Sequence, residues 1–329
     1  MSTGLFDRLR LPLACAPMSF ASSVDLAVAC SRAGIVAGWQ GGTLTPLEDF
    51  ERYLIALDEV RAAHMDAAHY GPPLVNFPAG IVNDAEIGAP KLKLCERWRP
   101  PLVLSSIGDP TEIAKRAHDW GAYVIHDITT VRHAEKALEA GVDGLMLTCA
   151  GAGGHTGALT PFAFVPKVRA MFDGLIIAAG GIADVAGING ALALGADIAC
   201  MGTRFIATPE AGAVDGHKQM IAATGMEEIV ISDAMNGVVA NWMRPSLVQV
   251  GLDPEHMPPK RGPKRGAEMP NGARPWRDIW SAGHSVGLIE DVAPVAEIVE
   301  RLATAFEAQN AGSWRVNLTR RLARGANAA

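Results

Sequence analysis

The sequence predicts a (β/α)8 barrel with a smaller segment added after its eighth strand. Three observations support this: short apolar runs alternate with helical patterns, eight such runs occur, and a helix–glycine–strand joint appears four times. The chain has 329 residues, of which 49% are hydrophobic, so it is too apolar for a disordered protein and can bury a large core. Its length alone also allows two domains.

The predicted strands are short runs of apolar and β-branched residues. In chain order they span residues 13–16, 35–37, 74–76, 102–104, 123–126, 144–147, 175–178 and 198–201.

The predicted helices lie between these strands, at residues 24–33, 48–63, 110–120, 131–140 and 185–194. Four of them are followed directly by Gly34, Gly121, Gly141 or Gly195. Glycine is favoured just past a helix end because it adopts positive φ without penalty. A doubly wound sheet would show the same joints, and the count of eight strands favours the barrel.

The chain after the eighth strand has a different character. The residue pattern predicts a helix at 209–224. Residues 251–283 are rich in Pro, Gly and basic side chains. An amphipathic helix is predicted at 292–309. We therefore expect the barrel to comprise residues 1–208 with 291–310, a lid on the substrate side to comprise residues 209–290, and residues 311–329 to form a tail.

Composition excludes several classes of protein. The net charge of -6 and the 6% aromatic content argue against nucleic-acid binding, which needs a basic surface or stacking platforms. No apolar run is long enough to span a membrane. The five cysteines show no C-x-x-C spacing, and no metal-ligand spacing occurs. We expect a cytoplasmic protein with reduced thiols and no bound metal.

In a parallel barrel, active sites form where the strands end at their carboxyl side. Nearly all residues at these predicted strand ends are small or polar, which suits a large, flat, polar ligand. They are Pro17, Met18, Gln40, Asn76, Ser105, Ser106, His126, Asp127, the loop 149–157, Gly180, Gly181, Gly202 and Thr203.

The last two strand ends predict a phosphate site. Gly180 and Gly181 follow the seventh strand, while Gly202 and Thr203 follow the eighth. Backbone N–H groups at such turns point toward an anion, and glycine lets the backbone approach it closely. The alternative is that both are merely tight turns.

The loop after the sixth strand places four glycines around one histidine, His155. Glycine there permits close approach to a planar cofactor, and histidine is a natural general base near neutral pH. A flexible loop with an incidental histidine is the alternative interpretation.

Taken together, these motifs resemble the nitronate monooxygenase (2-nitropropane dioxygenase-like) flavoproteins, from Leu13 to about Leu302. The residues that carry the resemblance are Ala16-Pro17-Met18, Asn76-Phe77, Ala152-Gly153-Gly154-His155-Thr156-Gly157, Ala179-Gly180-Gly181-Ile182, Met201-Gly202-Thr203-Arg204-Phe205, Trp280-Ser281-Ala282-Gly283 and Gly287-Leu288-Ile289.

The resemblance implies an FMN-dependent barrel enzyme in which His155 is the catalytic base or orients the substrate. It implies that Gly180, Gly181, Gly202 and Thr203 hold the FMN phosphate and that Met18 and Asn76 line the flavin ring. The other residues expected to contact the cofactor are Ala16, Pro17, His126, Ala152, Gly153 and Gly154.

Three positions depart from the family pattern. Gly151 stands where an acidic residue is usual, His126 where strand five often ends in lysine or a small polar residue, and His284 where glutamine is usual. These departures either indicate a substrate pocket different from that of simple nitroalkanes or reflect neutral drift. The substrate candidates are His284, Lys260 and Arg261.

The resemblance leaves the reaction open. The first hypothesis is the oxidation of alkyl nitronates with O2. The alternative is an FMN-dependent NAD(P)H reductase or dehydrogenase acting on a quinone, enoyl or acyl-CoA-type substrate, because enoyl reductases share the Gly-Gly-His loop. In that case the basic run 260–265 would hold the phosphates of a coenzyme A or nicotinamide ligand. A flavin-storing protein is the third hypothesis, and a homodimer is compatible with each.

Overall fold

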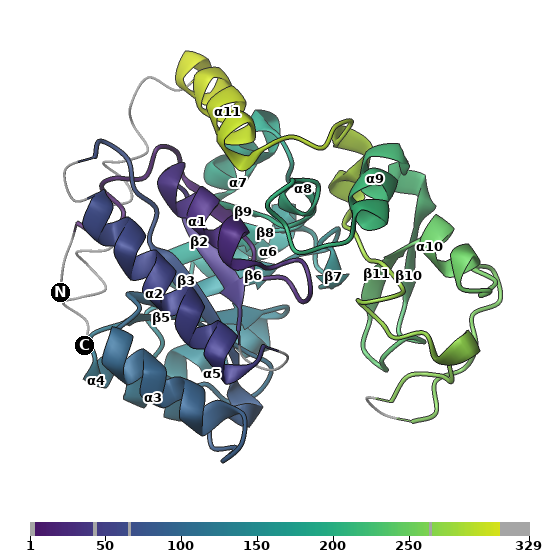
Figure 1. Cartoon of the computed structure of the whole chain (residues 1–329), viewed down its shortest axis with the longest axis horizontal. Coiled ribbons are helices and arrows are strands. Elements are labelled where there is room, and N and C mark those ends of the chain that lie inside the picture. The colour runs from purple at the N-terminus through teal and green to yellow at the C-terminus, as the bar shows by residue number, and fades with distance from the viewer. Residues whose placement is uncertain (1–3, 42–44, 65–66, 263–264, 310–329) are drawn as a thin grey trace.

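The computed structural model of the chain describes residues 4–41, 45–64, 67–262 and 265–309. Its centre is a closed barrel of eight parallel strands in the order β1-β2-β3-β4-β5-β6-β8-β9, which confirms the predicted fold (Figure 1). The strands are β1 (Leu13–Cys15), β2 (Val36–Gln40), β3 (Pro73–Pro78), β4 (Leu102–Ser106), β5 (Tyr123–Ile128), β6 (Gly144–Thr148), β8 (Leu175–Ala179) and β9 (Ile198–Met201).

The helices between the strands cover the outside of the barrel. The five predicted ones form as α1 (Val24–Arg32), α2 (Leu47–Ala63), α4 (Thr111–Asp119), α5 (Val131–Glu139) and α7 (Val185–Leu194). Side-chain oxygens of Ser23, Thr130 and Asp184 cap three of these helices by accepting from backbone N–H groups in the first turn.

Two barrel helices were missed in the sequence, α3 (Gly88–Trp98) and α6 (Pro161–Arg169). The first begins with Gly-Ala-Pro and the second carries Pro166 in its interior, and such residues normally indicate loops. Packing against the barrel therefore outweighs a weak local signal in both segments. The late helix α11 (Val295–Gln309) begins directly after Pro294, three residues later than predicted.

Side chains of the strands alternate between two cores, because successive residues of a strand face opposite sides of the sheet. Leu74, Leu104, Ile125 and Met146 belong to the cluster inside the barrel, where Phe6 of the N-terminal segment also packs. Residues one position away pack outward against the helices: Val75, Phe77, Val103, Val124, Ile128, Leu145 and Leu147.

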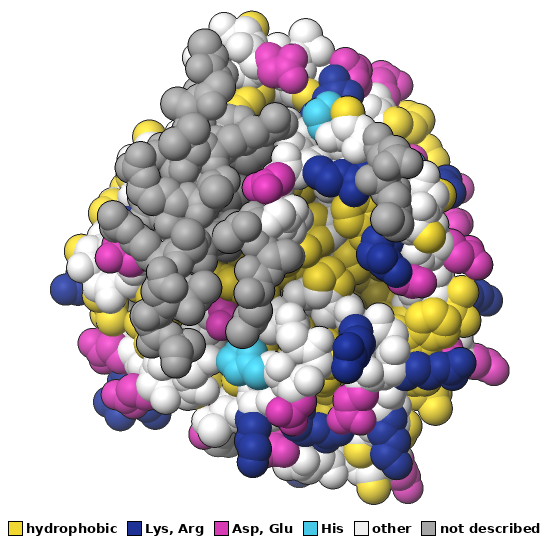
Figure 2. All heavy atoms as spheres, turned by 90° about the vertical axis from the view of Figure 1, so that its left-hand side faces the viewer, with side chains coloured by type: hydrophobic (Ala, Val, Ile, Leu, Met, Phe, Trp, Pro, Cys, Tyr) yellow, Lys and Arg dark blue, Asp and Glu magenta, His cyan; other side chains and the backbone are white. Residues whose placement is uncertain are grey.

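The end of the barrel at which the strands begin lies away from residues 209–290. There a small cavity beside the start of β3 is lined by Leu57, Tyr70, Trp98 and Pro101, with Arg61 beside them. Figure 2 shows this side of the molecule, with hydrophobic side chains in a hollow and Lys and Arg side chains around it. In barrel enzymes this end usually contributes to stability rather than to catalysis.

The lid segment, residues 209–290, lies on the other side of the barrel (Figure 1). It holds two strands of a three-stranded antiparallel sheet in the order β10-β11-β7. Its third strand, β7 (Gly154–His155), comes from the loop after β6. The remaining elements of the segment and its borders are α8 (Thr203–Ile206), α9 (Asp215–Ala223), η2 (Met226–Glu228), β10 (Ile229–Ser232), β11 (Ala240–Met243), α10 (Arg244–Gln249), η3 (Pro270–Gly272) and η4 (His284–Leu288); η1 (Ala79–Ile81) follows β3.

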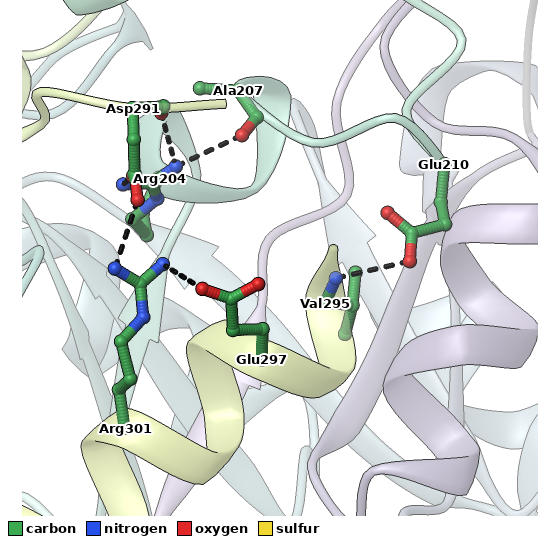
Figure 3. Close-up of polar contacts among 7 residues, drawn as sticks. All are labelled: Arg204, Ala207, Glu210, Asp291, Val295, Glu297 and Arg301. Atoms are coloured by element: carbon green, nitrogen blue, oxygen red, sulfur yellow. Dashed lines mark hydrogen bonds and ion pairs between the residues drawn. The ribbon is translucent and has the colours of Figure 1, made fainter. Parts of the chain in front are cut away.

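The two ends of the lid segment are tied to each other and to α11 (Figure 3). The buried Arg204 guanidinium donates to the Asp291 carboxylate at 2.7 Å and to the Ala207 and Asp291 carbonyls. Arg301 also donates to Asp291, at 2.9 Å, and the Val295 N–H donates to Glu210 at 3.0 Å. These contacts join the entry and exit of the lid where both meet the barrel.

Candidate functional site

Glycines at the ends of β8 and β9 form a cradle of backbone. Gly180 and Gly181 have φ values of +132° and +71°, and a Cβ placed on Gly181 would meet no atom within 4 Å. In the described part of the chain, no hydrogen bond engages the N–H groups of Gly181, Gly202 and Thr203. Such N–H groups, beside a short extra helix after the last strand, are typical of barrel phosphate sites.

The first strand end lies next to this cradle. A Cβ placed on Gly202 would lie 3.5 Å from both the Ala16 Cβ and the Met18 Sδ. The structure therefore brings together Ala16, Met18, Gly202 and Thr203, which the sequence predicted to share one site. Whether they bind a cofactor remains a prediction.

The glycine-rich loop after β6 packs closely against the end of the lid segment. The Gly283 N–H donates to the Thr203 hydroxyl at 2.9 Å, and the His284 N–H donates to the Gly151 carbonyl at 3.0 Å. A Cβ on Gly153 would lie 2.8 Å from the Gly283 nitrogen, so no larger residue fits there. The glycines of this loop thus allow three segments of backbone to meet at the barrel mouth.

His284 lies on the cradle side of the mouth. Its Nδ1 is 3.5 Å from the position of a Cβ built on Gly151, and the Gly181 nitrogen is 3.6 Å from that same point. The sequence suggested His284 as a substrate contact. That role remains a prediction.

His155 forms part of β7 (Gly154–His155), opposite Ala240 of β11. The Asn236 amide donates from Nδ2 to the His155 Nε2 at 2.9 Å, and its Oδ1 accepts from the Val238 N–H at 3.1 Å. The second bond fixes which end of the amide faces the histidine. Because Nε2 accepts, the proton of the neutral ring is on Nδ1.

The His155 ring is also held by aromatic contacts. Its ring packs edge to face on Trp276, with centroids 5.4 Å apart, and Trp276 stacks on Trp242 at 4.4 Å. Although the side chain is exposed, the protein around it desolvates the ring and lowers the pKa of His155 below its ordinary value. The ring is therefore neutral at neutral pH.

Polar side chains line the inside of the barrel at the ends of β3 to β6. Asn76 is buried and donates from Nδ2 to the Leu104 carbonyl at 3.1 Å and to the Ser106 hydroxyl at 3.2 Å. The Thr148 hydroxyl donates to Asp127 at 2.5 Å. We call Asn76, Ser106, Asp127 and Thr148 the polar arc.

His126 does not belong to this arc, and its prediction as a cofactor contact is not supported. It lies on the face of β5 that carries Val124 and Ile128, which pack outward. Burial lowers its pKa to about 4, and the titratable groups that also act on it, His133 and Asp109, belong to α5 and to the loop after β4. Alternation along the strand instead directs its neighbour Asp127 inward; the sequence placed Asp127 at this strand end but did not single it out as a cofactor contact.

The two basic substrate candidates lie in the lid away from the cradle. Lys260 forms an ion pair with Asp233, and Arg261 donates from Nε to the Gly266 carbonyl at 3.1 Å. Arg261 also lines a cavity of about 370 Å³ together with Met235 and Met269. Pro263 and Lys264 of the same basic run lie outside the described residues.

Two apolar residues in the loops after β1 and β4 have strained backbones. Phe20 has φ +54° and is 44% exposed, and Ile107 has φ +50° and is 62% exposed. A positive φ is unfavourable for a β-branched residue such as Ile107, and such strain concentrates at functional sites. No pattern in the sequence indicated either residue.

Among the described residues, no helix is long and apolar enough to cross a membrane. All five cysteines are buried and free.

Comparison with known proteins identifies relatives of the whole barrel. A family model described as nitronate monooxygenase matches residues 76–304. A nitronate monooxygenase from Neurospora crassa is 27% identical over 332 residues, covering 87% of this chain and 86% of the relative.

Other relatives match a shorter part of the chain. An indene-carboxyl-CoA dehydrogenase from Rhodococcus jostii is 29% identical, covering 52% of this chain and 49% of that protein. A nitronate monooxygenase from Paraburkholderia phytofirmans is also 29% identical, covering 62% of this chain and 60% of that protein. The chain thus matches about half to three fifths of the length of these two curated relatives.

Solved structures share the fold. FabK from Thermotoga maritima has 26% identity and a TM-score of 0.72, covering 93% of this chain and 96% of FabK. A nitroalkane oxidase from Streptomyces ansochromogenes has 23% identity and a TM-score of 0.74, covering 95% of this chain and all of that one, 100%.

Proposed function

The chain belongs to the nitronate monooxygenase family of flavin-dependent oxidoreductases, and from this premise we propose that it binds FMN at the barrel mouth and oxidises alkyl nitronates with O2. FMN, when bound, supplies the redox chemistry between the substrate and O2. The protein's own part is to hold the cofactor, orient the substrate and place hydrogen-bond donors.

Hydrogen-bond donors and small residues at the barrel mouth support the proposal of FMN. The N–H groups of Gly181, Gly202 and Thr203 would hold the phosphate, with His284 beside them. Ala16 and Met18 would contact the ring system from the neighbouring strand end. Asn76 would face the polar edge of the ring from across the barrel, because it lies on the inner face of β3.

The position of His155 carries the proposal for the substrate. Its Nε2 accepts from Asn236, so its Nδ1–H is the group that can donate. An alkyl nitronate bears negative charge on its oxygens, and a fixed N–H donor stabilises and orients such an oxygen. Of the two roles predicted for His155, this geometry favours orienting an anionic substrate over removing a proton from a neutral nitroalkane.

A second candidate function rests on a different observation. The relative from Rhodococcus jostii is named as a dehydrogenase of a CoA thioester, and the lid places Arg261 beside an open cavity. A basic side chain at such a cavity suits the phosphates of coenzyme A or a nicotinamide nucleotide. In this alternative the enzyme is a reductase or dehydrogenase of an enoyl, quinone or acyl-CoA-type substrate.

Anaerobic titrations distinguish the two functions. The flavin-loaded protein is mixed with propionate-3-nitronate or with NADH or NADPH, and the flavin absorbance is followed. Rapid bleaching by the nitronate and none by the nucleotides supports the monooxygenase. Bleaching by a nucleotide alone supports the second function, and an unbleached flavin in both titrations favours flavin storage.

A further inference from the structure

We propose that Asp127 is a cofactor-facing residue of this site, whose carboxyl group contacts the pyrimidine edge of the flavin and sets its affinity for negative charge. The inference rests on the proposed function, because it requires a flavin at the barrel mouth. It concerns the charge beside the cofactor, a property on which neither the sequence pattern nor the family match bears.

The register of β5 places Asp127 on the inner face of the barrel. Asp127 pairs with Met146 of β6, and its neighbour Ile125 pairs with Gly144. Met146 and Ile125 both belong to the cluster inside the barrel. Asp127 is one step further toward the strand end than Ile125 on that inner face, so its side chain lies at the floor of the mouth.

One carboxylate oxygen of Asp127 is already engaged. The Thr148 hydroxyl donates to Oδ1 at 2.5 Å. The Asp127 side chain is partly exposed. Its other oxygen, Oδ2, is not among the buried polar atoms that lack a hydrogen-bond partner in the described part of the chain. Thr148 therefore orients the carboxyl group while Oδ2 stays accessible from the mouth.

The two sides of the mouth differ in the chemistry they offer. The ends of β8 and β9 offer glycine N–H groups, whereas the inner ends of β3 to β6 carry the polar arc. FMN has a matching asymmetry, with a phosphate at the end of its ribityl chain and carbonyl, N–H and nitrogen groups on its pyrimidine edge. With the phosphate in the glycine cradle, the polar arc is the surface that complements the pyrimidine edge.

Asp127 is the one acid of the arc, and its surroundings leave it uncompensated. Burial raises the pKa of Asp127 to about 6, with Thr148 opposing the rise, and among the residues that the structure describes no basic group contributes. The titratable neighbours are the Cys149 and Cys200 thiols, whose pKa values burial raises, so both stay neutral near pH 7. Above its pKa, Asp127 therefore places an unpaired negative charge at the floor of the mouth.

A carboxylate beside the pyrimidine edge disfavours further negative charge on the flavin. Sulfite measures this effect without turnover, because its addition to oxidised flavin places negative charge on the N1–C2=O region and bleaches the visible absorbance. We expect Asp127→Asn to bind sulfite about tenfold or more tightly than the wild type at pH 8, since it removes a like charge at close range. At pH 5, where Asp127 is protonated, the two proteins should bind sulfite alike.

Two further variants serve as controls. Asp127→Glu keeps the charge and should retain the weak sulfite binding at pH 8. His126→Asn changes the adjacent residue on the outer face of the same strand and should bind sulfite as the wild type does. In Asp127→Asn the new side chain is isosteric with aspartate and its Oδ1 can still accept from the Thr148 hydroxyl, so this variant is expected to fold. The pH dependence of wild-type sulfite affinity, taken relative to Asp127→Asn at each pH, should show the wild type weakening above about pH 6.

The outcomes separate this inference from the proposed function. Flavin-loaded Asp127→Asn and wild type with equal sulfite affinities at pH 8 would overturn the role of Asp127 and leave the cofactor site standing. A wild-type chain that retains no flavin after reconstitution would overturn both. Equal strengthening in Asp127→Asn and His126→Asn would show a general loosening of β5 and would also contradict the inference.

Discussion

At the barrel mouth, the side formed by β8 and β9 is made of backbone, whereas the lid side is made of side chains. Gly180, Gly181 and Gly202 present N–H groups from short turns. His155 is held instead by Asn236 and Trp276, which lie far from it in the sequence. The contrast suggests a division of labour in which the barrel retains the cofactor and the lid orients the substrate, so the two properties should respond separately to substitution.

The largest expected effect is the loss of flavin on filling the glycine cradle. Gly181→Val places a side chain where an anion would approach, and its φ of +71° adds about 1–2 kcal/mol of backbone strain. We expect the purified protein to hold almost no flavin, as measured by absorbance after reconstitution. Gly121→Val is the matched control, because Gly121 has φ +82° and equally open surroundings at the other end of the barrel. Flavin loss in both variants would contradict the assignment of the cradle.

Removing the His155 side chain, the proposed donor on the lid side of the mouth, should lower turnover without changing the flavin content. His155→Ala should lower kcat/KM for a nitronate by about 10²-fold to 10³-fold, the range for a positioned catalytic hydrogen-bond or proton-transfer group. Flavin content should stay as in the wild type, because His155 is not part of the cradle. Steady-state oxygen consumption and the flavin spectrum measure the two properties. Unchanged turnover would support flavin storage instead.

Releasing the histidine from its partner should have a smaller effect of the same kind. Asn236→Leu removes the Nδ2–H that holds the His155 Nε2. We expect kcat/KM to fall about tenfold, the cost of losing one orienting hydrogen bond. Asn241→Leu is not a suitable control because the Asn241 side chain donates to the Ala152 carbonyl of the glycine-rich loop. Asn189→Leu, an exposed change in α7, should leave turnover unchanged.

The junction between barrel and lid should respond in stability. Asp291→Ala leaves the buried Arg204 guanidinium without its carboxylate, and we expect unfolding free energy to fall by about 2 kcal/mol. Glu297→Ala removes only an exposed contact with Arg301 at 3.8 Å and should cost less than about 0.5 kcal/mol (Figure 3). Urea unfolding of both variants measures the difference. Equal costs would show that the junction does not depend on Arg204.

The smallest effects concern pH. Burial lowers the pKa of His126 in the barrel and of His217 in the lid to about 4 each. The unfolded chain therefore binds more protons between pH 4 and 6.5, so these histidines have no effect on stability above pH 6.5 and the fold loses stability as the pH drops toward 4. Asp127 acts in the opposite direction, because its pKa is raised. His126→Asn and His217→Asn should each flatten the dependence of stability on pH in this window, by at most about 1.4 kcal/mol per pH unit, and leave stability near pH 7 unaffected by this titration; urea unfolding at several pH values measures the slope.

The barrel and the glycines at the ends of β8 and β9 could be predicted from the amino-acid sequence. Strand and helix periodicities are local, and a glycine with positive φ at a strand end acts through its own backbone, so both features are visible without knowing what lies nearby. Two helices were missed where proline and glycine obscured the periodicity, because packing on the barrel compensates for them.

Which side chains face the mouth, and which partners they contact, depends on the folded chain and could not be predicted from the sequence. His126 and Asp127 are adjacent at one strand end, and the closure of the barrel turns the histidine outward and the acid inward. The sequence likewise contains no sign that Asn236 would meet His155 across 81 residues or that β7 would join the sheet of the lid. The direction of a strand's side chain depends on the register of the whole barrel, and a contact between distant residues depends on the path of the chain between them.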